Sequence, residues 1–159
     1  MDNKKKQNLT PKEALIKAAS YCAYQERCHE EVLGKLTELG IYGNDAGNIL
    51  NQLIEQNYLN EERFAKAFAG GKFRTKKWGR VKILLELKAR KISDYCIKQA
   101  MKEIDEDEYL KVLKKLASEK FESLSDKNIL IKKNKTAKYI ASRGFEVELV
   151  WDLLNKSSF

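Results

Sequence analysis

The sequence predicts an all-α protein built from three tandem three-helix repeats that form an elongated body of undetermined curvature. Proline occurs once, at Pro11, and glycine is scarce in a chain rich in Lys, Glu, Leu and Ala, a composition that favours helices. Apolar residues recur at helical spacing along the chain. One turn pattern also returns at intervals of about fifty residues, which is typical of helical repeats.

The recurring turn pattern defines the repeats. Each copy ends a helix, turns and then offers one apolar residue to the core, at Ile41, Ile92 and Phe145. Gly40 and Gly144 suit a left-handed helix cap, and Lys91 holds the equivalent position in the middle copy. We therefore expect a disordered basic tail over 1–10 and repeats over 11–57, 58–104 and 105–159, with flexible joints near 56–60 and 104–108.

The first repeat has three predicted helices. The first begins at Pro11, after Thr10, and buries a stripe of small and apolar residues from Ala14 to Cys22. The second runs from about 29 to 39, and the third from about 45 to 56. Cys28 precedes the second helix, where it makes a poor N-cap.

The second repeat begins with Asn60 as an N-cap, followed by acids that favour the helix dipole. Its first helix should direct Phe64 and Phe68 inward, while Gly70 and Gly71 either end that helix or allow another backbone to approach. A second helix starts near Gly79, with four inward residues: Val81, Ile83, Leu84 and Leu87. Ser93 or Asp94 caps the third.

The third repeat should begin a helix at Asp107 or Glu108 that turns Leu110, Leu113, Leu116, Ala117 and Phe121 inward. A second helix is predicted to start at Ser125–Asp126 and to reach Arg143. A third covers 146–154, with Val147, Val150, Trp151 and Leu154 inward.

Positive charge is concentrated in the second repeat. Residues 63–91 hold eleven Lys or Arg and one acid, a net charge of +10, whereas the whole chain carries +8. The remainder therefore sums to −2, and the excess is local. A solvated helix face would normally interleave acids, so this segment predicts a polyanion or an acidic protein surface as its partner.

The same residues argue against catalysis and cofactors. The single histidine, His29, has no nucleophile or acid at supporting spacing, and Gly70-Gly71-Lys72 lacks the spacing of a phosphate-binding loop. Three cysteines without a CxxC pair predict neither a disulfide framework nor a metal site. We expect no enzyme activity, no cofactor and no membrane span, and a cytoplasmic monomer.

The central segment resembles the RecX family of bacterial recombinase regulators. The resemblance rests on Tyr58-Leu59-Asn60-Glu61-Glu62-Arg63-Phe64-Ala65, on Lys76-Lys77-Trp78-Gly79-Arg80 and on Tyr139-Ile140-Ala141-Ser142-Arg143-Gly144-Phe145. It extends over roughly residues 12–155. It implies a non-enzymatic protein that binds the RecA–DNA filament, lies in its groove and inhibits its ATPase, strand-exchange and coprotease activities.

Binding residues follow from charge and from this resemblance. The candidates for contact with RecA, with single-stranded DNA or with duplex DNA are Arg63, Lys72, Arg74, Lys76, Lys77, Trp78, Arg80, Lys82, Lys132, Lys133, Lys135 and Lys138. Trp78 either stacks on a base, anchors in a protein pocket or packs against its own repeat. Arg63 points either outward or toward an acid of the first repeat. The alternative function is a stand-alone, largely non-specific DNA-binding protein.

Overall fold

The protein is described by a computed structural model that covers residues 9–156. Every regular element in that range is an α-helix, which confirms the predicted fold class. The helices are α1 (Pro11–Tyr24), α2 (His29–Glu38), α3 (Gly43–Glu55), α4 (Glu61–Lys76), α5 (Arg80–Ala89), α6 (Asp94–Met101), α7 (Glu106–Ser123), α8 (Ile129–Ser142) and α9 (Val147–Lys156).

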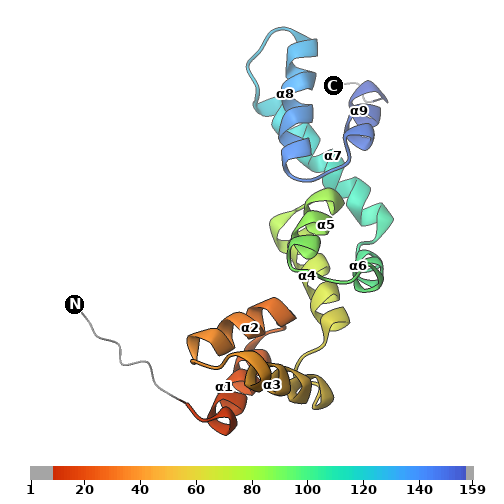
Figure 1. Ribbon diagram of the computed structural model, residues 1–159. Coiled ribbons are helices and arrows are strands. Elements are labelled where there is room, and N and C mark those ends of the chain that lie inside the picture. The colour runs from red at the N-terminus through yellow and green to blue at the C-terminus, as the bar shows by residue number, and fades with distance from the viewer. Residues whose placement is uncertain (1–8, 157–159) are drawn as a thin grey trace, which may run out of the picture.

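The helices pack as three trios that follow one another along an elongated body (Figure 1). Within each trio all three helices contact one another: α1–α3, α4–α6 and α7–α9. The first and last trios lie at opposite ends, with α4–α6 between them. The loops between trios, after α3 and after α6, include the repeat boundaries that we propose at 57/58 and 104/105.

Two hydrophobic cores run through this body. The first trio has its own core, in which Val32, Leu36 and Leu53 are fully buried. The second and third trios share one continuous core, because Tyr109 of the last trio packs against Phe73 of the middle one and against Phe145 of its own. The expected flexible joint near 104–108 is therefore wrong as a description of how these trios meet, since packed rings bridge it.

The turn pattern has the predicted backbone geometry. Gly40 and Gly144 have positive φ angles of 79° and 94°, and Lys91 adopts the same left-handed region at 57°. Asn60 and Ser93 cap α4 and α6 by accepting hydrogen bonds from backbone N–H groups. Cys28 precedes α2 without a side-chain cap, as its thiol predicts.

Some boundaries differ from the prediction because other residues provide the caps. Thr10 was placed in the tail, yet it forms a capping box with Glu13 at the start of α1; residues 1–8 of that tail lie outside the described residues. Asp105 caps α7, so the helix begins before Asp107. Asn128 accepts from two backbone N–H groups and starts α8 later than Ser125–Asp126.

Three of the inward residues named above are exposed instead. Val81, Leu110 and Val147 are 42%, 41% and 51% exposed, because each lies beside rather than on the buried stripe of its helix. The neighbour of Leu110, Tyr109, is fully buried instead. Gly70 and Gly71 lie inside α4 and do not end it.

Candidate nucleic-acid interface

The cations of the basic segment fall into two groups. Arg63, Lys66, Arg80, Arg90 and Lys91 each form an ion pair with a carboxylate, at distances from 2.5 to 3.4 Å. Within residues 9–156, no ion pair involves the other six: Lys72, Arg74, Lys76, Lys77, Lys82 and Lys88. Fewer cations are therefore available to an external partner than the charge count of the sequence indicates.

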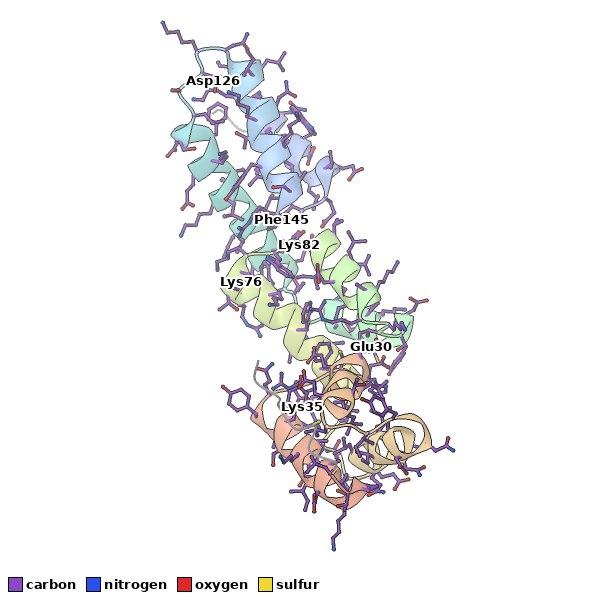
Figure 2. The ribbon with its side chains drawn as sticks, turned by 60° about the vertical axis from the view of Figure 1, so that its left-hand side comes forward. Glu30, Lys35, Lys76, Lys82, Asp126 and Phe145 are labelled. Carbon is purple, nitrogen blue, oxygen red and sulfur yellow. The ribbon has the colours of Figure 1, made fainter. Side chains whose placement is uncertain are left out.

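Five of these cations lie around the turn that joins α4 to α5. We call Lys72, Arg74, Lys76, Lys77, Trp78 and Lys82 the basic surface. Figure 2 shows Lys76 and Lys82 in the middle of the body, close to Phe145 of the last trio. Lysines at the end of α4 also stabilise that helix by their favourable interaction with its dipole. Lys82 lies at the start of α5, where a cation has no favourable interaction with the helix dipole.

Trp78 is the aromatic centre of the basic surface. Its ring is partly buried and meets the edge of Phe68, with centroids 6.3 Å apart. The ammonium nitrogens of Lys72 and Lys82 lie 5.0 and 4.3 Å from its centroid. Trp78 therefore packs partly on its own repeat and still presents an indole bracketed by cations.

The turn that carries Trp78 is fixed by the last trio. The Gly79 N–H donates to the carbonyl of Arg143 at 2.8 Å, and the Val81 N–H donates to that of Gly144 at 2.9 Å. The Arg143 guanidinium in turn donates to the Lys76 carbonyl at the end of α4. These bonds hold the α4–α5 turn, and with it the basic surface, against repeat three.

Arg80 belongs to this junction. Its guanidinium pairs with Glu106 and with Glu146, each at 2.7 Å, and lies 4.0 Å from the centroid of the Tyr109 ring. Burial acts to lower the pKa of Arg80, but the hydrogen bonds that it donates to Glu146 and Glu106 outweigh burial and raise the pKa, so Arg80 stays cationic. The side chain links α5 to α7 and to the turn before α9.

Tyr109 completes the junction. Its hydroxyl accepts from the backbone N–H of Arg80 at 3.1 Å and donates to Glu146 Oε1 at 2.6 Å. Burial and the hydrogen bond to Glu146 raise the pKa of Tyr109, so the proton stays on the phenol. Sequence reasoning missed this residue because Leu110 beside it is the more obvious core residue.

Arg63 is also turned toward its own protein, which is the second of the two orientations that the sequence left open. Its Nε lies 2.5 Å from Glu26 Oε1, and its Nη2 donates to the carbonyls of Asn57 and Tyr58 at 3.1 and 3.3 Å. The partner is Glu26 of the first repeat. Arg63 thus links the first trio to the second.

The predicted lysines of α8 form a separate group on the last trio. Lys135 pairs with Asp126 at 2.8 Å, and that hydrogen bond lowers the pKa of the Asp126 carboxyl. Lys132 lies 4.2 Å from the centroid of the Phe121 ring. Lys133 and Lys138 have no ion pair among the residues described. The charge of α8 is therefore more dispersed than that of the basic surface.

Other chemistry has little support in this part of the chain. No group of three or more His, Cys, Asp or Glu within residues 9–156 is placed to hold a metal ion. The three cysteines are buried, and burial raises the pKa of each thiol, which keeps it protonated and weakly nucleophilic. Across the same residues, the helices are too short or too polar to cross a membrane.

Comparison with known proteins supports the resemblance seen in the sequence. Residues 60–101 match the family model described as RecX, second three-helix domain, a span that coincides with α4–α6 and the Asn60 cap. Regulatory protein RecX of Lactobacillus johnsonii is 30% identical over 136 residues, covering 86% of this chain and 50% of the relative. That of Lactobacillus gasseri is 32% identical over 147 residues, covering 90% and 53%.

Solved structures share the fold. A crystal structure of RecX from Lactobacillus salivarius superposes with a TM-score of 0.81 at 23% identity, covering 92% of this chain and 95% of that one. A second RecX structure gives 0.79 at 20% identity, covering 99% and 79%. The chain spans about half the length of the curated relatives it matches. The sequence matches, centred on the second three-helix domain, show that the chain belongs to the RecX family.

Proposed function

We propose that this protein is a non-enzymatic, monomeric regulator that binds the RecA–DNA filament and inhibits its ATPase, strand-exchange and coprotease activities. Family membership supports the choice of RecA as partner. The observation that carries the proposal is the basic surface: five cations without internal acids on the middle trio of an elongated body. A polyanionic filament relieves the mutual repulsion of those cations.

The inhibition follows from the contacts that hold the three trios together. Arg63 links the first two trios, and the Gly79–Gly144 contact with the Arg80 ion pairs links the last two. A body braced at both junctions can contact neighbouring RecA subunits and resist their relative movement. ATP turnover and strand exchange need such movement, so both activities fall together.

The contact residues that we propose are those of the basic surface, with Lys133 and Lys138 of α8 as a second set. Arg63 and Arg80 act through the two junctions, because acids of the protein already hold their guanidinium groups. Lys132 and Lys135 have aromatic and acidic partners within the last trio and should contribute less.

A stand-alone DNA-binding role is the second candidate, favoured by the indole at the centre of the basic surface. Against it, lysines dominate that surface, and lysines contact phosphates more than base edges, so sequence selectivity should be low.

Binding to naked DNA and to preformed RecA–DNA filaments, measured at rising salt, separates the two roles. The filament role predicts weak, steeply salt-dependent binding to naked DNA and tighter binding to filaments. Equal affinity for both, or sequence-selective binding to naked DNA at physiological salt, favours the stand-alone role.

A further inference from the structure

Trp78 has an arrangement that charge alone does not require. The indole lies between the end of α4 and the start of α5, and a lysine from each helix places its ammonium over the ring, at 5.0 Å for Lys72 and 4.3 Å for Lys82. Among the described residues, neither lysine has an acidic partner. The group thus combines one flat aromatic surface with two available cations.

We propose that Trp78 is a stacking platform for a base of single-stranded nucleic acid, and that Lys72 and Lys82 move from the ring to the adjoining phosphates when the base stacks. This inference rests on the proposed function and deepens it, because it names the filament component that the basic surface contacts. An acidic protein surface offers carboxylates to the lysines but no flat partner for the indole.

The exchange of partners is favourable on general magnitudes. An exposed lysine over an indole contributes about two- to fivefold to an equilibrium constant, whereas a base stacked on an aromatic side chain contributes about 5- to 150-fold. Phosphates then replace the ring as partners of both ammonium groups, so neither cation is left unpaired. The base therefore displaces the lysines without a net loss of contacts.

The platform is held in place before any ligand binds. The next residue, Gly79, donates its N–H to Arg143, and the Arg80 N–H donates to the Tyr109 hydroxyl at 3.1 Å. The Phe68 ring supports the indole from its own repeat. Because the turn is fixed on both sides, stacking requires only that two lysine side chains rearrange, which lowers the entropic cost of binding.

Tryptophan fluorescence tests the proposal on the intact chain. The second tryptophan, Trp151, lies in α9, so Trp151→Phe leaves Trp78 as the single indole. We expect oligothymidylate to quench this fluorescence at low salt, and an abasic oligonucleotide of equal length to bind without quenching. Equal quenching by both probes, or none by either at saturation, would overturn the proposal. This comparison needs no change at Trp78 itself.

Affinity measurements separate stacking from charge. Trp78→Leu should weaken binding to oligothymidylate by about 5- to 150-fold while leaving the salt dependence and binding to duplex DNA unchanged. Lys72→Gln with Lys82→Gln should instead reduce the slope of log K against log salt by about 1.4, from two lost phosphate contacts. Wild-type affinity of a folded Trp78→Leu for oligothymidylate would contradict stacking.

The two proposals fail in different ways. If only the stacking is wrong, Trp78→Leu binds DNA like the wild type, yet RecA inhibition still requires the lysines. If the regulatory function is wrong, RecA activity is unaffected by the wild-type protein, whatever its fluorescence shows with oligothymidylate.

Discussion

The backbone of Gly79 lies directly against the backbone of Gly144, from the turn before α5 to the turn before α9. A Cβ at Gly79 would overlap the Gly144 carbonyl, and one at Gly144 would overlap the side chain and backbone of Lys82. Backbone hydrogen bonds of 2.8 and 2.9 Å cross this contact. The middle and last trios are therefore joined by a contact between main-chain atoms, and a side chain at either glycine would push the two turns apart.

Gly79→Ala should destabilise the protein by about 1–3 kcal/mol, because the atoms that its Cβ would meet are backbone and cannot move aside. Gly47→Ala is the matched control, since a Cβ there meets nothing within 4 Å. Because alanine is more stable than glycine inside a helix, this substitution should stabilise the protein by about 0.5–1 kcal/mol. Urea denaturation measures both. A Gly79→Ala protein as stable as the wild type would show that the two turns are not in contact.

Arg63→Ala should lower the free energy of unfolding by about 1–3 kcal/mol, since it leaves Glu26 and two carbonyls without their donor. Lys66→Ala in the same helix removes only a surface pair with Glu62 and should leave stability nearly unchanged. Thermal melting compares the two variants. Equal melting temperatures would contradict a structural role of Arg63 in linking the first two trios.

Tyr109→Phe should lose about 1–2 kcal/mol near pH 8, because the backbone N–H of Arg80 and the Glu146 carboxylate lose the hydroxyl. The raised pKa of Tyr109 means that its contribution is complete below the ordinary tyrosine pKa, near 10, and is lost as pH rises beyond it. The stability difference between wild type and variant should therefore narrow above about pH 10.

Urea unfolding at several pH values measures that difference. The three buried thiols also have raised pKa values and lower stability at alkaline pH, but they do so in both proteins and cancel in the comparison. A difference that stays constant to about pH 11 while both proteins remain folded would contradict the hydrogen-bonded phenol.

Local rules in the sequence were sufficient for most of the helices. Asn60 caps α4 as its type predicts, and the repeating turn led to the left-handed backbone of Lys91 although lysine seldom adopts it. Such features depend on residues a few positions apart. Val81 and Leu110 were misplaced because an apolar residue at the edge of a helix stripe satisfies the same periodicity as one in its centre.

The junctions could not be predicted, because they depend on which surfaces meet. Arg80 has the same charge as Lys82, yet only Arg80 faces Glu106 and Glu146, which follow it by many residues in the chain. Gly144 was recognised as a helix cap, but its contact with Gly79 has no local signal. Five cations of residues 63–91 have carboxylate partners within the protein, which the charge count alone could not show.

RecA ATPase on single-stranded DNA, titrated with this protein, tests the regulatory function most directly. The wild type should inhibit, and Arg74→Glu, Lys76→Glu and Lys77→Glu together should abolish inhibition while each shifts stability by only about 0.5 kcal/mol. Lys12→Glu, Lys111→Glu and Lys114→Glu make the same change in net charge at exposed lysines elsewhere and should inhibit like the wild type. Undiminished ATPase at several-fold molar excess of the wild type would contradict the account, as would full inhibition by the folded basic-surface variant.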